Sequence, residues 1–194
     1  SNALQMAVGL GAHVIVLDKN VDTLRRLDAQ YGNRIQTVFS TRHALENWVR
    51  QADLVIGAVL IPGAAAPKLV NRQLLSDMQR GAAIVDVAID QGGCFETSTP
   101  TTHDQPTYIV DDVVHYCVAN MPGALARTAT QALNNATLPF IQQLANKGTA
   151  AALSDNIHLR RGLNITHGEL CCAEVGEAQN RVTITLDEAL KRLK

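Results

Sequence analysis

The chain has 194 residues, of which 46% are hydrophobic and 18% are charged, and its 17 basic and 18 acidic residues leave a net charge of -1. A chain of this size can bury a core of its own. Because neither sign of charge forms long runs, neither nucleic acid nor an anionic membrane is indicated as a partner. No apolar run reaches the roughly 20 residues of a membrane span and no secretory leader is recognisable, so we expect a cytoplasmic protein.

The four cysteines are too few for a disulfide-stapled scaffold, and the adjacent Cys171 and Cys172 lack the spacing of a structural zinc site. We therefore expect reduced thiols and no metal. Residues 1–3, with the sequence Ser-Asn-Ala, are typical of the scar that tag removal leaves. The native sequence is expected to begin near Leu4 or Met6.

From its start to about residue 120 the chain alternates short apolar runs with amphipathic segments. Strands are predicted over residues 13–17, 34–39, 53–59 and 82–87. Helices are predicted over residues 21–31, 41–51 and 72–78, with a loop at 61–63. Strands that are apolar on both faces and alternate with helices indicate a parallel sheet covered by helices on each side. The predicted fold is a doubly wound α/β domain.

The second half of the chain has a different texture. After a polar stretch at residues 96–106, interpreted as an ordered loop, strands are predicted over 107–110 and 113–118. The chain then becomes helical from Pro122 to about Asn146, and Pro139 is expected to kink this helix because proline removes one hydrogen bond. Short helices are expected around residues 162–168, and a closing helix from Leu186 onward.

Asp18 ends the first predicted strand, at the sheet edge where open α/β folds bind their ligands. A carboxylate there can accept hydrogen bonds from both ribose hydroxyls of an adenine nucleotide, and its charge would repel a 2′-phosphate. The residue therefore favours NAD over NADP. It could equally cap the following helix, and the pattern around Asp18 leaves both roles open.

The glycine motif that would decide between these roles is not where a nucleotide site needs it. Gly9 and Gly11 precede the Asp18 strand, where a Rossmann domain has the end of its first helix, whereas a true G-x-G-x-x-G opens that helix. Residues 6–11 are therefore expected to be the last turns of that helix. The phosphate loop and the first strand would lie upstream of residue 4.

Two further positions are expected at the same edge of the sheet. Asp90 follows the fourth strand and precedes a Gln-Gly-Gly sequence, so it is either a carboxylate in the ligand crevice or a turn-former. Asn120 and Met121 form a strand-to-helix junction whose backbone groups either contact a nicotinamide or simply start a helix.

Three long runs, residues 52–64, 85–96 and 116–124, resemble those of the L-alanine dehydrogenase family, and the resemblance continues through 132–139 and 162–164. It covers nearly the whole chain. Members of that family bind NAD in a Rossmann domain and interconvert L-alanine with pyruvate and ammonia by hydride transfer. The resemblance implies a Rossmann-type domain without its first strand and glycine loop over residues 4–127. Residues 128–194 would then be a long helix and a C-terminal segment that belongs to the substrate domain.

The resemblance also implies roles for single residues. Asp90 would be the catalytic acid of the cofactor domain. The residues implied to line the cofactor site are Asp18, Ser40, Val59, Leu60, Val87, Asn120 and Met121. The family's acid/base histidine and its pyruvate-binding lysine and arginine belong to an N-terminal domain that these 194 residues do not contain. No general base is therefore assigned, and the chain alone is expected to be inactive.

Two alternatives remain beside this interpretation. One is the NAD-binding subunit of a transhydrogenase, which shares the ancestry but not the sequence at residues 134–137; the other is a non-catalytic remnant that oligomerises. In the usual strand order the missing first strand lies between the Asp18 strand and the Asp53 strand, which leaves two inward edges without partners. We therefore expect a homo-oligomer, or an exchange of elements between chains.

Overall fold

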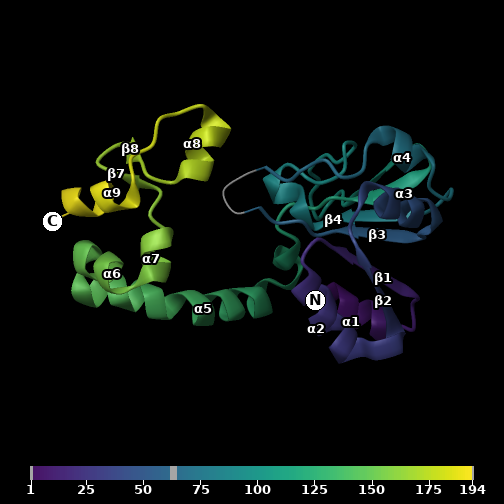
Figure 1. Cartoon of the computed structure of the whole chain (residues 1–194), viewed down its shortest axis with the longest axis horizontal. Helices are drawn as coiled ribbons and strands as arrows, with labels where there is room; N and C mark the ends of the chain where they lie inside the picture. The colour runs from purple at the N-terminus through teal and green to yellow at the C-terminus, as the bar shows by residue number, and fades with distance from the viewer. Residues whose placement is uncertain (1, 62–64, 194) are drawn as a thin grey trace. The chain divides into compact units, whose positions relative to one another are not determined.

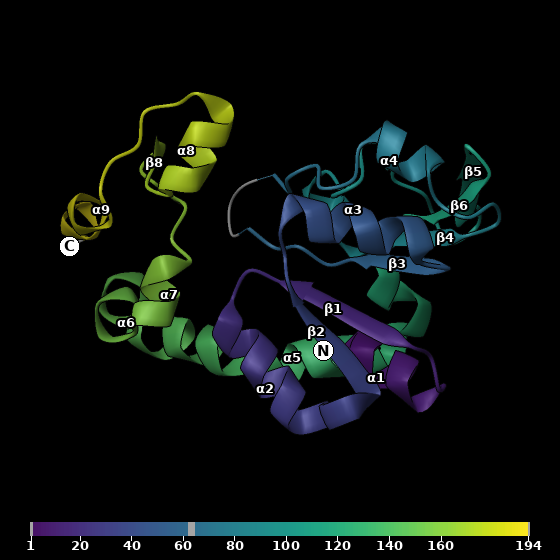
Figure 2. The ribbon, with the colours of Figure 1, turned by 45° about the vertical axis from the view of Figure 1, so that its right-hand side comes forward.

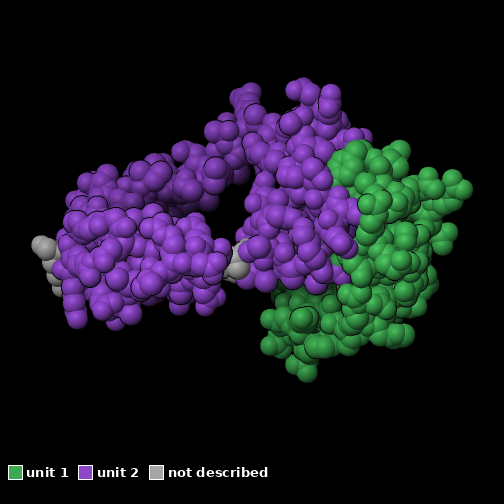
Figure 3. Space-filling view, turned by 90° about the horizontal axis from the view of Figure 1, so that it is seen from above, with its two compact units in different colours: residues 1–56, 70–85, 108–115 green, residues 57–69, 86–107, 116–194 purple. Residues whose placement is uncertain are grey.

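The computed structural model describes residues 2–61 and 65–193 (Figure 1). Of the predicted loop at 61–63, Pro62 and Gly63 lie outside the described residues. The chain divides into two compact units (Figure 3). Unit 1 comprises residues 1–56, 70–85 and 108–115, and unit 2 comprises residues 57–69, 86–107 and 116–194. Over the ranges that the structure describes, no helix is both long enough and apolar enough to cross a membrane.

Unit 1 begins with a helix and a parallel pair of strands. Its first elements are α1 (Asn2–Gly9), β1 (Val14–Asp18), α2 (Val21–Tyr31), the 3-10 helix η1 (Gly32–Arg34) and β2 (Ile35–Phe39). The register of the parallel pair places Val14 opposite Ile35 and Asp18 opposite Phe39. The carboxyl ends of both strands therefore lie side by side, as a ligand site of an α/β fold requires.

Helices α1 and α2 lie beside this strand pair (Figure 2), and a small apolar core joins them. Leu27 and Tyr31, four residues apart on one face of α2, are buried with Ile35, the first residue of β2. The partly buried side chains packed against them are Leu4, Val8, Val14 and Val16. Since Leu4 and Val8 belong to α1, both helices contribute to this core.

The glycines at the end of α1 behave as predicted. Helix α1 ends at Gly9, and Gly11 has a φ of 77°, the left-handed conformation typical of a helix terminus. The N–H of Leu10 donates to the carbonyl of Met6, and the N–H of Gly11 donates to the carbonyl of Val8. These glycines close a helix and do not open one, so they do not form a phosphate loop.

A second sheet has the strand order β3-β4-β6-β5. Its strands are β3 (Leu54–Gly57), β4 (Ala83–Asp86), β5 (Thr107–Val110) and β6 (Val113–Tyr116), with α3 (Arg42–Gln51) and α4 (Arg72–Ser76) on either side of β3 in the chain. Asp111 and Asp112 join β5 to β6 with φ values of 50° and 63°, as in a two-residue hairpin turn. The sheet is therefore mixed, with flanking helices, and the predicted α/β fold is confirmed.

Strands β1 and β3 each lie at the edge of their sheet, where the sequence predicts that the first strand of a Rossmann domain is missing. Within the described part of the chain, β1 hydrogen-bonds to β2 and β3 to β4, and β1 and β3 are not paired with each other. Leu54 and Ile56 of β3 are 51% and 38% exposed although both are large and apolar. The prediction that the Asp18 and Asp53 strands are not neighbours is confirmed.

Unit 2 carries the helical part of the chain. In order it contains the 3-10 helices η2 (Val87–Gln91) and η3 (Met121–Leu125), then α5 (Ala126–Lys147), α6 (Thr149–Asp155), α7 (Ile157–Arg161), the strands β7 (Ile165–Thr166) and β8 (Glu169–Leu170), α8 (Ala173–Gln179) and α9 (Leu186–Arg192). The long helix starts at Ala126 and not at Pro122, because η3 forms a tighter turn first. It continues through Pro139 to Lys147.

One predicted element of unit 2 is wrong. Residues 165–168 are not helical: β7 and β8 pair antiparallel, with Ile165 opposite Leu170 and Thr166 opposite Glu169. His167 and Gly168 between them have φ values of 47° and 81°. Two successive left-handed residues make a tight hairpin turn, which ends any helix before it. The closing helix predicted from Leu186 is confirmed as α9.

Candidate functional site

Asp18 and Ser40 lie together in unit 1, at the carboxyl ends of β1 and β2. The Asp18 carbonyl accepts a hydrogen bond from the N–H of Ser40 at 3.0 Å, and the Asp18 Oδ1 accepts one from the N–H of Asn20 at 2.8 Å. The helix cap is Asn20, whose side chain accepts from the N–H groups of Asp22 and Thr23 at 2.9 and 3.1 Å. Because Asn20 takes the capping role, the half-buried Asp18 carboxylate keeps acceptor capacity for a ligand.

Val87 and Asp90 lie on η2, which follows β4 directly in the chain. In a 3-10 helix residues three apart share a face, and here Val87 and Asp90 are both exposed while Ala88 and Ile89 between them are buried. The left-handed conformations of the turn belong to Gly92 and Gly93, with φ values of 88° and 77°. The glycines therefore form the turn, and the Asp90 side chain is not needed for it.

Val59 and Leu60 lie in the connection after β3, in unit 2. The predicted strand continued to Val59, but β3 ends at Gly57. At that residue the backbone lies against the side chains of Cys94 and Phe95, which leave no room for a Cβ. Leu60 is 73% exposed and Val59 is half-buried, so this connection offers an apolar surface.

Asn120 and Met121 start η3, as one of the two interpretations of this junction predicted. Asn120 adopts the left-handed conformation, with φ 56° and ψ 51°. Its carbonyl accepts hydrogen bonds from the Gly123 N–H at 2.9 Å and from His103 Nε2 at 3.0 Å. Because the Asn120 carbonyl already has two donors, any ligand contact here falls to the exposed Asn120 side chain and the half-buried Met121.

The sequence interpretation missed Asp86, the last residue of β4. Its side chain is fully buried, and its Oδ2 accepts from the Cys94 N–H at 2.9 Å, the Phe95 N–H at 3.4 Å and the Ser98 Oγ at 2.5 Å. Its Oδ1 accepts from the Ala88 N–H at 3.1 Å. A charge inside an otherwise apolar strand is the signal that could have identified it, since a buried carboxylate must be matched by donors.

Cys94 is also drawn into this cluster. Its thiol donates to Asp86 Oδ1 at 3.6 Å, and only 2% of the residue is exposed. Burial, reinforced by the charge of Asp86, raises the pKa of the Cys94 thiol to about 12. Cys94 is therefore a protonated core residue at neutral pH and not a nucleophile.

Lys68 contacts the same stretch of backbone as Asp86. Asp86 accepts hydrogen bonds from N–H groups of this stretch, whereas Lys68 donates hydrogen bonds to its carbonyls. The Lys68 ammonium donates to the carbonyls of Gly92 at 2.5 Å and Phe95 at 3.2 Å. The next residue, Leu69, donates its N–H to the Cys94 carbonyl at 2.8 Å. Residues 66–69 and 91–95 are thus joined by a short ladder of hydrogen bonds within unit 2.

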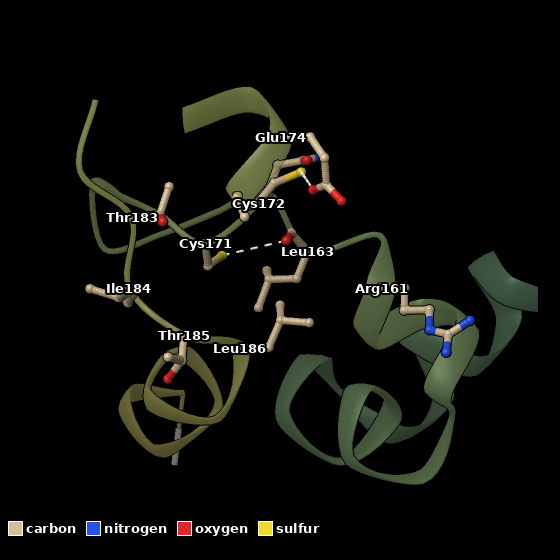
Figure 4. A pocket seen from close by; sticks show the side chains of 11 residues that line it. Arg161, Leu163, Cys171, Cys172, Glu174, Thr183, Ile184, Thr185 and Leu186 are labelled. Carbon is tan, nitrogen blue, oxygen red and sulfur yellow. Dashed lines mark hydrogen bonds between the residues drawn. The ribbon is translucent and has the colours of Figure 1, made fainter. Parts of the chain in front are cut away.

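A hollow of about 710 Å³ lies in the C-terminal part of unit 2 (Figure 4). In it the Cys171 thiol donates to the Leu163 carbonyl at 3.4 Å and the Cys172 thiol donates to Glu174 at 3.3 Å. Backbone hydrogen bonding, together with the Cys172 thiol, holds the pKa of the Glu174 carboxyl below its ordinary value. None of the predicted site residues lines this hollow.

All four cysteines are free thiols, including the adjacent Cys171 and Cys172. Across residues 2–61 and 65–193, His, Cys, Asp and Glu side chains do not gather in a group of three that could hold a metal ion.

Parallel strands that alternate with helices, with polar side chains at the carboxyl ends of the strands, define a Rossmann-like α/β domain of the dehydrogenase kind. The family model described as "Alanine dehydrogenase/PNT, C-terminal domain" matches residues 1–173. The chain belongs to this family, which confirms the resemblance found in the sequence.

Individual relatives agree with this assignment. The chain is 64% identical over 177 residues to an alanine dehydrogenase of Halomonas elongata, a match that covers 91% of this chain and 48% of the relative. It is 53% identical over 192 residues to an alanine dehydrogenase of Staphylococcus saprophyticus, with coverages of 98% and 52%. The chain therefore spans about half the length of these curated relatives.

Two solved structures resemble the chain to different degrees. An L-alanine dehydrogenase matches with a TM-score of 0.80 and 50% identity, over 92% of this chain and 49% of that chain. A transhydrogenase from Sinorhizobium meliloti matches with a TM-score of 0.57 and 27% identity, over 66% of this chain and 36% of that chain.

Proposed function

We propose that this chain is the cofactor-binding part of an NAD-dependent L-alanine dehydrogenase, which converts L-alanine, NAD and water to pyruvate, ammonia and NADH. The observation that carries the proposal is the carboxylate of Asp18 at the end of β1, with Asn20 in its place as the helix cap. The family membership of the chain supports the same conclusion.

The Asp18 carboxylate suits the ribose of an adenine dinucleotide without a 2′-phosphate. Asp18 would accept hydrogen bonds from the ribose hydroxyls, and Ser40 lies beside it at the end of β2. Val59 and Leu60 would line the adenine, while Val87, Asn120 and Met121 would border the nicotinamide. NAD, when bound, supplies the acceptor of a hydride from the substrate carbon.

Asp90 is proposed as the acid of the cofactor domain. Its exposed carboxylate lies on the same face of η2 as Val87, so a group that borders the nicotinamide and a group that can carry a proton are presented together. Asp90 would orient the amino group of alanine and exchange a proton at its carboxylate oxygens.

The proposal is tested with the product of the whole coding sequence that contains these residues. We expect NADH production that depends on L-alanine and falls at least about a hundredfold in the Asp90→Asn variant, while Asp104→Asn, at an exposed aspartate in the same unit, leaves it unchanged. Alanine-dependent activity that survives in Asp90→Asn would remove Asp90 from the mechanism; its absence from the wild type would remove the proposed function.

The transhydrogenase alternative is weaker, because its structural match has the lower TM-score, identity and coverage. The same assay separates the two: a transhydrogenase subunit binds NAD but gives no NADH from alanine.

The 194 residues alone are proposed to be inactive and to associate. Their sequence contains no G-x-G-x-x-G motif, whose backbone amides would be directed at a pyrophosphate. We expect NADH to bind at least about a hundredfold more weakly than to an intact site, since each lost charge-assisted hydrogen bond removes more than about 1 kcal/mol. The unpaired edges of β1 and β3 favour a homo-oligomer, and the mass of a monomer in light scattering would refute that part.

A further inference from the structure

We propose that Asp86 and Lys68 are positioning residues that hold the Asp90 segment, residues 87–98. Asp86 accepts hydrogen bonds from backbone N–H groups of the segment, and Lys68 donates hydrogen bonds to its backbone carbonyls. Neither residue belongs to the proposed cofactor site. The inference rests on the proposed function only for the role of Asp90 itself; the holding of the segment stands on the contacts of the two residues.

Asp86 anchors both ends of the segment with one carboxylate. The N–H of Ala88 at its start donates to Oδ1 at 3.1 Å, and the Ser98 hydroxyl at its end donates to Oδ2 at 2.5 Å. Between them the Cys94 N–H donates to Oδ2 at 2.9 Å. A single fully buried charge thus fixes three points of a segment whose middle carries Asp90 and two glycines.

Lys68 holds the same segment by its carbonyls. Phe95 is the residue at which both anchors meet, since its N–H donates to Asp86 and its carbonyl accepts from Lys68 at 3.4 and 3.2 Å. Lys68 also donates to the carbonyl of Gly92, two residues after Asp90. Because glycines at 92 and 93 give the backbone freedom, these charge-assisted hydrogen bonds, together with the burial of Ala88 and Ile89, limit the positions that Asp90 can occupy.

Space around the segment is consistent with a fixed geometry. A Cβ at Gly93 would lie 2.6 Å from Asp86 Oδ2 and 2.9 Å from Ser98 Cβ, so the backbone approaches the carboxylate as closely as glycine permits. Cys94 and Phe95 are 2% and 1% exposed, which anchors the C-terminal side of the segment in the core of unit 2.

The first test is amide hydrogen exchange on the 194-residue chain, which needs no activity. In Asp86→Asn an NH2 group replaces one of the two acceptor oxygens and faces backbone N–H donors, so those hydrogen bonds are lost. Exchange at Ala88, Cys94 and Phe95 is therefore expected to be at least about tenfold faster, while exchange in α6 stays unchanged. The matched control is Asp155→Asn, which removes an exposed ion pair with Lys147 in the same unit and should leave the segment unchanged. Unchanged exchange at residues 88–95 would overturn the inference.

Two further variants keep the test decisive if Asp86→Asn does not fold. Ser98→Ala removes one donor and leaves the charge, so the same amides should exchange faster by a smaller factor. Lys68→Met keeps the length of the side chain without its ammonium, and should speed exchange at Leu69, whose N–H donates to the Cys94 carbonyl. No change in either variant would refute the role of the corresponding anchor.

The second test distinguishes positioning from a merely structural role, in the product of the whole coding sequence. If Asp86 acts through Asp90, Asp86→Asn lowers kcat for alanine oxidation about tenfold, and the double variant with Asp90→Asn is no slower than Asp90→Asn alone. Additive losses would contradict positioning. If the wild type shows no alanine-dependent activity, the proposed function fails, whereas the exchange experiment still decides whether the two anchors hold the segment.

Discussion

Gly57→Ala should destabilise the protein although alanine is the better residue for a strand. A Cβ at this position would lie 2.3 Å from Cys94 Sγ and 2.6 Å from Phe95 Cε2. Both neighbours are almost fully buried, with 2% and 1% exposed, so neither can swing aside. Such overpacking costs about 1–3 kcal/mol, which exceeds the roughly 0.5–1 kcal/mol that alanine gains over glycine in the backbone.

Urea unfolding followed by circular dichroism measures this difference. With a slope of about 2 kcal/mol/M, a net loss of roughly 1–2 kcal/mol lowers the midpoint by about 0.5–1 M. Gly9→Ala is the matched control: a Cβ there meets nothing within 4 Å, so its midpoint should stay equal or rise. In a double variant, Cys94→Ala should cost less in the Gly57→Ala background than it does alone, because it removes the atom closest to the new Cβ. Equal midpoints for Gly57→Ala and Gly9→Ala would refute the reasoning.

Three further predictions concern single side chains. Asp18→Asn is expected to weaken NADH binding about tenfold and to lower the ratio of NADH affinity to NADPH affinity. The control Asp22→Asn, at an exposed aspartate, should leave the affinity and the ratio unchanged, and isothermal titration with each nucleotide measures both. Cys94, whose pKa is raised to about 12 by burial and by Asp86, is protonated at pH 8, so iodoacetamide should label Cys172 there and spare Cys94, and early labelling of Cys94 would contradict the burial. Thr185 accepts from the Glu188 N–H while Glu188 accepts from the Thr185 N–H, so Thr185→Ala should speed amide exchange in the first turn of α9 about fivefold, and equal rates would show that the cap is idle.

Much of the fold could be predicted from local patterns in the sequence, such as helix caps and apolar periodicity. The predicted helices at residues 21–31 and 41–51 agree with α2 and α3 to within one residue, because an Asn or Thr cap and a buried face every three to four residues mark such helices strongly. The gap between β1 and β3 was also predictable, since the position of Asp18 fixes which strand of the sheet it ends.

The errors lie where tight turns override periodicity. A short helix was predicted around residues 162–168, but consecutive left-handed residues at His167 and Gly168 turn residues 165–170 into a hairpin. Histidine is one of the few non-glycine residues enriched in that conformation and glycine adopts it freely, so the pair His167-Gly168 was the signal of a turn. The β5–β6 hairpin through Asp111 and Asp112 is not among these errors, since strands were predicted on both sides of that turn.

The candidate site divides in the same way. Long runs of family-like sequence identify the positions that would meet the cofactor, and the structure adds which neighbours hold them. Asn20 as the cap of α2 rules out the capping role left open for Asp18, because only the backbone geometry shows which side chain reaches the free N–H groups. Asp86 binds the backbone 8 residues further along the chain and Lys68 binds it 27 residues further along, and no spacing in the sequence indicates such contacts.

The most direct test of an NAD-dependent alanine dehydrogenase built on this domain is the rate of NADH formation by the product of the whole coding sequence. With L-alanine and NAD we predict steady turnover that falls at least about a hundredfold in Asp90→Asn, as expected when a proton-transfer group is removed. NADH formation that is absent with L-alanine, or equal in wild type and Asp90→Asn, would contradict the proposed function.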